Sequence, residues 1–179
     1  DEKDIIRGIS KFRTSGTRQN LVNVGGYFLF VDCFNASLSS VESSLDGLKK
    51  MEIQGKKKKI AIIGDVTGMG EKEEEINRNI AQVLSNAAGD LDHLVLYGEN
   101  GRQIYNMMTG RRDHVQVLGK KKELNRWMER NIARGDIALF KGSSKTKLDE
   151  RIDDVYGTNF ADGKYVEESR FAVRKQKGV

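Results

Sequence analysis

The chain has 179 residues, 37% hydrophobic and 32% charged, with a formal net charge of +5, which suits one soluble globular domain and admits anionic partners. No apolar run approaches the roughly 20 residues needed to cross a bilayer and no signal peptide opens the chain, so we expect no membrane association. A lone cysteine and two histidines exclude a disulfide framework, predict no metal site and indicate a reducing, cytoplasmic compartment.

The first part of the chain predicts a short helix followed by a hairpin. Residues 1–12 place apolar side chains at helical spacing. Residues 18–24 and 27–32 have the pattern of two strands, and Gly25-Gly26 between them is typical of a two-residue hairpin turn. This hairpin is expected to add one antiparallel strand to a larger sheet.

A helix is predicted directly after the hairpin. Ser39 and Glu42, three residues apart, have the spacing of a capping box. Apolar residues then recur on one face of the helix, which is expected to pack on the sheet. These residues are Leu38, Val41, Leu45, Leu48 and Met51.

From residue 59 onwards, short apolar strands alternate with helices. Strands are predicted at 59–65, 93–98, 114–119 and 135–143, and helices at 71–86, 100–110, 121–134 and 147–157. Right-handed crossovers turn this order into an α/β fold, a Rossmann-like, mostly parallel sheet with helices on both faces. We therefore expect one domain over residues 1–156 and an extension over 157–179, to which the sequence assigns no role.

Polar residues gather where the predicted strands end, and in doubly wound sheets ligands bind beyond these carboxyl ends. Carboxylate and amide groups could hold a ribose and a base there, and cationic and backbone groups a carboxylate or phosphate. The residues are Asp32, Phe34, Asn35, Asp65, Lys141, Ser143 and Lys145. Because the motifs G-x-G-x-x-G and G-x-x-x-x-G-K-[ST] are both missing, the domain is not expected to hold a triphosphate by itself.

The run Lys56–Lys59 is the strongest local concentration of positive charge. Nucleic-acid patches normally interleave aromatic residues with the basic ones, and none occur here. The run therefore favours a solvated loop before a strand, and we expect no nucleic-acid partner.

Four short motifs, in order and on the expected strand–helix pattern, resemble the carboxyl-terminal domain of the Mur ligases. The motifs are Thr17-Arg18, the stretch from Asp32 to Leu38, the stretch from Gly64 to Gly70, and Lys141-Gly142-Ser143-Ser144. The resemblance covers about residues 4–155. Within the family, it is closest to the ligases that add D-alanyl-D-alanine to the UDP-N-acetylmuramoyl tripeptide.

This resemblance implies an ATP-dependent acid–amino-acid ligase of peptidoglycan precursor synthesis, in which a central ATPase domain outside this sequence carries the phosphate loop. That domain would bind most of the Mg²⁺, and the missing domains would bind a UDP-muramoyl-peptide-like acceptor. The domain in this sequence would bind the adenosine side of ATP and the incoming amino acid or dipeptide, and would be inactive alone.

The resemblance also assigns roles to individual residues. Arg18 would reach the ATP phosphates, Asp32 would bind the ribose hydroxyls, and Phe34 and Asn35 would lie against the adenine. Asp65, Lys141, Ser143 and Lys145 would face the incoming substrate.

Several positions depart from the family pattern and leave alternatives open. Leu38 replaces the usual proline, Thr67-Gly68 replaces Leu-Glu, Asn77 replaces a common histidine, and Ser144 replaces arginine. A diverged ligase that makes another amide, such as a γ-glutamyl bond, is one alternative, and a nucleotide-binding module without catalysis is another. For individual residues, the alternative is that Asp32 and Asn35 only satisfy a helix terminus and that Asp65 only caps a turn.

Overall fold

The computed structural model describes residues 16–51, 57–66 and 72–162, and in this part of the chain one six-stranded sheet has the order β1-β2-β6-β3-β4-β5. The strands are β1 (Asn20–Val24), β2 (Tyr27–Asp32), β3 (Lys59–Gly64), β4 (His93–Tyr97), β5 (Val115–Leu118) and β6 (Ile137–Lys141). β1 pairs with β2 in antiparallel fashion, and every other pairing is parallel. The predicted fold class and hairpin are confirmed.

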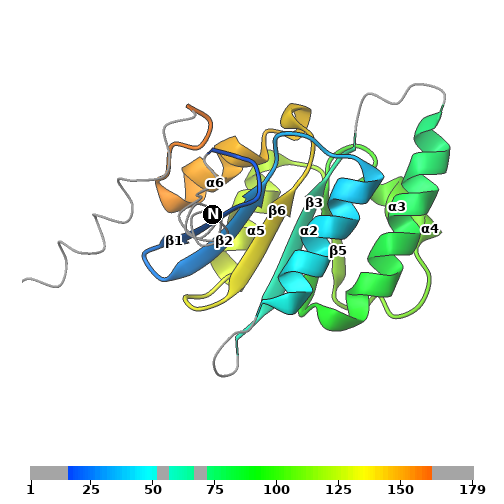
Figure 1. Ribbon diagram of the computed structural model, residues 1–179, viewed down its shortest axis with the longest axis horizontal. Coiled ribbons are helices and arrows are strands. Elements are labelled where there is room, and N and C mark those ends of the chain that lie inside the picture. Colours follow the sequence, from blue (N-terminus) through cyan, green and yellow to red (C-terminus); the bar gives the residue numbers. More distant parts are fainter. Residues whose placement is uncertain (1–15, 52–56, 67–71, 163–179) are drawn as a thin grey trace, which may run out of the picture.

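Helices cover both faces of this sheet (Figure 1). They are α2 (Leu38–Lys50), α3 (Glu73–Ala87), α4 (Gly101–Met107), α5 (Lys121–Asn131) and α6 (Leu148–Tyr156), with the short 3-10 turns η2 (Ala88–Asp90) and η3 (Ser144–Thr146). Apolar side chains of α2, α3 and α4 share one core with one face of the sheet, and those of α5 and α6 share a second core with the other face. The crossover order that the sequence predicted therefore produces two layers of helices around one sheet.

The start of α2 differs from the prediction. The N-cap is Ser37, whose backbone is extended (φ −126°, ψ 163°), and its hydroxyl accepts from Ser40 N while Ser40 Oγ accepts from Ser37 N. The capping box predicted at Ser39 and Glu42 is wrong because Ser39 already lies inside the first turn. The apolar face was predicted well, since Val41, Leu45 and Leu48 are buried, but a polar residue, Ser44, is buried among them.

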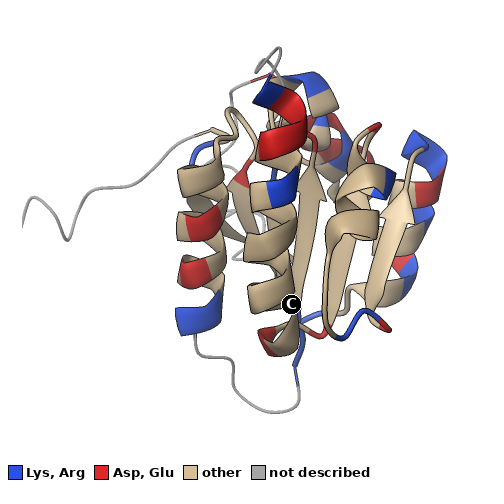
Figure 2. Cartoon of the chain, turned by 90° about the vertical axis from the view of Figure 1, so that its right-hand side faces the viewer, with Lys and Arg blue, Asp and Glu red and all other residues tan. Residues whose placement is uncertain are grey.

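Charged residues lie mainly on the helices and at the ends of strands (Figure 2). Asp32 and Lys141, the last residues of β2 and β6, are informative because both are buried and lie on neighbouring strands. Ionisable residues are seldom fully buried unless they are paired. This pair therefore points to the part of the sheet where the candidate site lies.

The chain leaves β6 on the opposite face from its two neighbours. After β2 and β3 it continues into α2 and α3 on one face, whereas after β6 it continues into α6 on the other. In open α/β sheets, ligands bind where successive connections diverge in this way, beyond the carboxyl ends of the strands. The end of β6, at Lys141, is such a point.

Some predicted features lie outside the described residues. These are the helix over 1–12, Lys56, Thr67-Gly68 and residues 163–179 of the extension. The described start of the extension packs on α6, where Phe160 is 1% exposed. Among the described helices, none has the length and apolar character that a membrane span requires.

Candidate nucleotide and substrate site

The candidate site is built on a pair of neighbouring strand ends. β2 and β6 are parallel and in register, so that Asp32 and Lys141 are direct partners across the ladder. Lys141 Nζ lies 3.0 Å from Asp32 Oδ2, and the two side chains are 1% and 8% exposed. The apolar strands thus deliver one carboxylate and one ammonium group to the same buried point.

Two further groups hold the Asp32 carboxylate. The hydroxyl of Ser44, on α2, donates to Oδ2 at 2.6 Å. The backbone N–H of Gln19 donates to Oδ1 at 3.2 Å. Each carboxylate oxygen has two lone pairs. Among the residues that the structure describes, Oδ1 therefore has an acceptor position to spare, while both positions of Oδ2 are taken.

The segment after β2 is fastened to the end of β6. Lys141 Nζ donates to the carbonyl of Asn35 at 2.6 Å, and Ser144 N donates to the carbonyl of Phe34 at 3.1 Å. Cys33 N donates in turn to the carbonyl of Thr17 at 2.9 Å. The side chains of Phe34 and Asn35 are exposed on this fastened segment.

Arg18 and Phe34 form an exposed stack beside the Asp32 carboxylate. Arg18 Cζ lies 3.9 Å from the centre of the Phe34 ring, which is within the range of a cation–π contact. The Phe34 residue is 48% exposed, which is uncommon for a large apolar side chain in this fold. Residues predicted to bind ATP therefore meet at one edge of the sheet: Arg18, Asp32, Phe34 and Asn35.

Asp65 lies beyond the neighbouring strand end and has a clear local partner. Its two oxygens accept from the backbone N–H groups of Glu99 at 2.8 Å and Asn100 at 3.0 Å, at the start of α4. Burial nevertheless raises the pKa of the Asp65 carboxyl above its ordinary value of 3.8. The capping alternative for Asp65 thus has direct structural support, and its role toward a substrate stays a prediction.

The remaining predicted substrate residues lie in the turn after β6. Ser143 is 6% exposed, and its N–H donates to the carbonyl of Asp65 at 3.1 Å, which joins the end of β6 to the end of β3. Lys145 lies on η3 and is exposed. Of the cations in this turn, Lys145 therefore faces solvent whereas Lys141 is enclosed.

Comparison with known proteins identifies the family of this chain. The family model described as "Mur ligase, glutamate ligase domain" matches residues 17–144, which is well over half of the 179 residues. The chain belongs to this Mur ligase domain family. The matched range contains the end of β2, the end of β6 and every predicted site residue except Lys145.

One curated relative is the UDP-N-acetylmuramoyl-tripeptide–D-alanyl-D-alanine ligase of Bacillus subtilis (strain 168), which is 28% identical over 156 residues. The match covers 86% of this chain and 33% of the relative. This Mur ligase domain therefore spans about a third of the length of the curated relative that it matches.

Solved structures show the same fold. MurF from Acinetobacter baumannii has a TM-score of 0.71 at 18% identity, with 87% of this chain and 33% of that chain covered. MurF from Thermotoga maritima in complex with ADP has a TM-score of 0.64 at 18% identity, covering 89% and 36%. MurC from Thermotoga maritima has a TM-score of 0.60 at 15% identity, covering 100% and 34%.

The residues that sequence reasoning missed in this Mur ligase domain are those that act on Asp32. Ser44 could have been suspected from the sequence, because it is a polar residue within the apolar face of the predicted helix. Gln19 could not have been identified from the sequence, because its contribution comes from the backbone N–H. A backbone group carries no residue-type signature, so only the folded chain reveals it.

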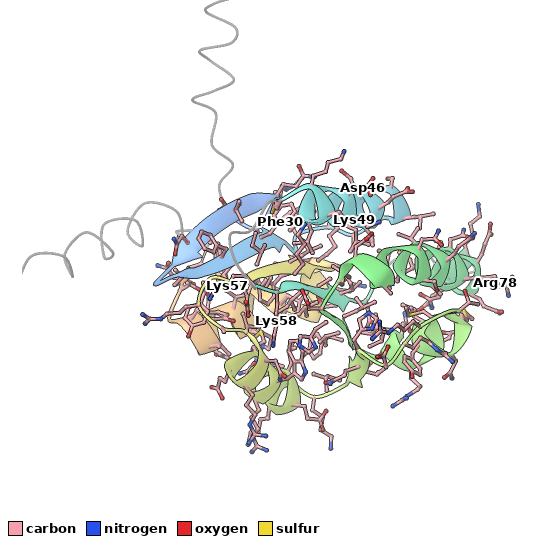
Figure 3. All side chains as sticks on the ribbon, turned by 90° about the horizontal axis from the view of Figure 1, so that it is seen from below. Phe30, Asp46, Lys49, Lys57, Lys58 and Arg78 are labelled. Carbon is pink, nitrogen blue, oxygen red and sulfur yellow. The ribbon has the colours of Figure 1, made fainter. Side chains whose placement is uncertain are left out.

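Cys33 and the lysine run have structural explanations of their own. Burial, followed by the charges of Asp149 and Asp32, raises the pKa of the Cys33 thiol far above its ordinary value, so this cysteine is not an activated nucleophile. Lys57 and Lys58 directly precede β3. They lie on the side of the sheet where its parallel strands begin, which faces the viewer in Figure 3. Their ammonium groups donate to carbonyls at and beyond the end of α5, namely those of Arg134 and Asn131.

Those two contacts suit the negative end of a helix dipole. Lys59 makes the matching contact at the end of α2, with the carbonyl of Lys49. Three lysines of the run therefore donate hydrogen bonds to carbonyls at or just beyond helix ends, on the side of the sheet opposite to the candidate site.

Proposed function

We propose that this Mur ligase domain holds the adenosine side of ATP and the incoming amine in a cytoplasmic, ATP-dependent ligase that forms an amide bond during peptidoglycan precursor synthesis. The observation that carries the proposal is the meeting of Arg18, Phe34 and Asp32 at the carboxyl end of β2, inside the range matched by the family model.

The groups present fit an adenosine moiety. A ribose hydroxyl can donate to Asp32 Oδ1, which has an acceptor position to spare when the contacts of residues 16–51, 57–66 and 72–162 are considered. The exposed Phe34 ring offers an apolar face on which a base can stack, and Asn35 supplies an exposed amide beside it. Arg18 places a guanidinium at the same edge, where it can contact phosphate oxygens.

The triphosphate of ATP and its Mg²⁺ need binding groups other than those described for the adenosine moiety. Among the residues it describes, no three His, Cys, Asp or Glu side chains are grouped so that they could hold a metal ion. We assign the Mg²⁺ and the phosphate loop to the part of the ligase outside this domain, as the resemblance to the Mur ligases implies. This division is consistent with a domain that spans about a third of its curated relative.

The chemistry proposed for the complete ligase is the activation of a carboxylate by ATP, followed by attack of an amine on the acyl phosphate. The share of this domain is positioning, which can lower a barrier by about 7–11 kcal/mol when both reactants are held in the reactive geometry. Lys145 and the turn that begins at Ser143 would face the amine, beside the nucleotide and on the same edge of the sheet.

The chemical identity of the amine is left at the level of an amino acid or dipeptide. Related structures are named for different added groups, among them alanine and D-alanyl-D-alanine. A screen of amines that records ADP release by the protein, expressed from its complete reading frame, would identify the substrate.

Calorimetric titration with ATP tests the nucleotide part of the proposal in the same protein. Replacing Phe34 with Ala should weaken ATP binding roughly 5- to 150-fold, because stacking of a base on an aromatic ring contributes about 1–3 kcal/mol. Leu21→Ala is the matched control, because Leu21 is also a large apolar residue with high exposure (42%) and lies on β1. ATP binding that is undetectable, or that Phe34→Ala leaves unchanged, would reject this assignment.

A further inference from the structure

We propose that Lys141 and Ser44 are positioning residues that orient the Asp32 carboxylate and the Phe34–Asn35 segment toward the nucleotide, and that Lys141 itself touches neither substrate. This inference rests on the proposed function, and it replaces the substrate-contact role that the sequence predicted for Lys141.

The first argument is the burial of Lys141. Its side chain is 1% exposed, and its ammonium group donates to Asp32 Oδ2 at 3.0 Å and to the Asn35 carbonyl at 2.6 Å. Two of its three hydrogens are thus used inside the domain. An incoming amine would have to displace a buried ion pair in order to reach it, whereas Lys145 is already exposed in the same turn.

The second argument is the division of labour between the two oxygens of Asp32. Lys141 and Ser44 both donate to Oδ2, from β6 and α2 respectively. These two bonds fix the plane and rotation of the carboxylate from its inner side. Oδ1 is then presented beside Gln19 N, next to Arg18, with an acceptor position to spare among the described contacts.

The Ser44 hydroxyl has a choice of acceptors that strengthens this point. It lies 2.6 Å from Asp32 Oδ2 and 2.8 Å from the carbonyl of Ser40. A hydroxyl has one hydrogen, and a charged carboxylate is a stronger acceptor than a neutral carbonyl. The hydrogen is therefore assigned to Asp32, which makes Ser44 a specific partner of the carboxylate.

The third argument is the link from Lys141 to the base-binding segment. The Phe34 carbonyl is held by Ser144 N and the next carbonyl, of Asn35, is held by Lys141 Nζ. Both donors belong to the end of β6 or the turn that follows it. The end of β6 and the turn after it therefore hold the backbone that carries the exposed Phe34 ring beside Asp32.

A double-mutant cycle in ATP binding tests the inference, with the protein expressed from its complete reading frame. Ser44→Ala should raise the Kd for ATP about 3- to 10-fold, within the range of coupling measured between contacting residues. Because Ser44 acts through Asp32, the effect of Ser44→Ala should disappear in an Asp32→Asn background. Ser43→Ala is the matched control, because Ser43 is the neighbouring exposed serine on α2.

Lys141→Met is the second arm, and Lys141→Arg tests for rescue of ATP binding by a retained cation. Lys141→Met should raise the Kd for ATP and leave the KM for the amine unchanged, whereas Lys122→Met, at an exposed site on α5, should change neither. If Lys141→Met does not fold, the Ser44 cycle decides the question.

The outcomes separate this inference from the function on which it rests. The inference is supported if the wild-type protein binds ATP, if Ser44→Ala and Lys141→Met weaken this binding, and if the effect of Ser44→Ala disappears in the Asp32→Asn background. Additive effects of Ser44→Ala and Asp32→Asn, or a raised KM for the amine in Lys141→Met, would overturn it while leaving nucleotide binding intact. A wild-type protein that does not bind ATP would overturn the proposed function, and this inference with it.

Discussion

The carboxylate of Asp65 fills the space directly in front of Gly98. A Cβ atom on Gly98 would lie 2.3 Å from Asp65 Oδ2, a distance at which the two atoms cannot coexist. Gly98 also has a φ of +123°, which disfavours any residue with a side chain. The glycine after β4 is therefore required both by its own backbone and by the capping contacts of Asp65.

Replacing Gly98 with Ala should lower the free energy of unfolding by about 2–4 kcal/mol, since backbone strain alone costs about 1–3 kcal/mol and the Asp65 carboxylate must also move. Urea denaturation measures this change. Gly119→Ala is the control, because a Cβ there would meet nothing within 4 Å and should change stability by less than about 0.5 kcal/mol. Equal effects of the two substitutions would contradict the steric explanation.

The raised pKa of Asp65 predicts a particular pH dependence. Because burial raises the folded-state pKa above 3.8, the folded protein holds this proton to higher pH than the unfolded chain does. The contribution of Asp65 to stability is therefore present below pH 3.8 and is lost as the pH rises through the raised pKa. Denaturation at a series of pH values should show wild type losing stability relative to Asp65→Asn across this interval, and a constant difference would refute it.

The buried pair of Asp32 and Lys141 predicts strong non-additivity in stability. Lys141→Met alone leaves the Asp32 carboxylate without its counter-ion, and Asp32→Asn alone leaves the ammonium group, so each should cost about 3–5 kcal/mol. The double substitution removes both charges and should cost clearly less than the sum of the two. Thermal or urea unfolding of all four proteins gives the coupling, and simple additivity would show that the charges do not depend on each other.

The Asp153 carboxylate binds the start of the extension to α6 through several hydrogen bonds. Its oxygens accept from Thr158 Oγ1 at 2.6 Å, Phe160 N at 2.7 Å and Ala161 N at 2.9 Å. Asp153→Ala should lower the free energy of unfolding by about 2–3 kcal/mol, because hydrogen bonds to a charged group contribute about 1.5–3 kcal/mol each and part of that is recovered by water. Amide hydrogen exchange should then quicken at Phe160 and Ala161.

The control for Asp153 is Asp46→Ala, at an exposed position on the outer side of α2. It should leave both stability and exchange near Phe160 unchanged. Faster exchange throughout the sheet in Asp153→Ala would mean that the contacts support the whole domain rather than the extension alone.

Much of the fold was predictable because its signals are local. The continuous apolar run of β3, the Gly25-Gly26 turn and the helical spacing on α2 each lie within one short window of sequence. The prediction at the start of α2 failed because Ser37, Ser39 and Ser40 are chemically equivalent in the sequence. Only the backbone angles decide which of them lies outside the first turn.

For the candidate site, the residue types at the strand ends could be predicted from the sequence, because the change from an apolar run to Asp32 or to Lys141 is visible within a few residues. The tertiary structure alone decided which of these residues meet. Lys141 and the Asn35 carbonyl that it holds are 106 positions apart, and they meet because β6 is inserted between β2 and β3. Periodicity reports the neighbours of a residue along one helix or strand, whereas pairing between distant strands depends on the free energy of packing the whole sheet.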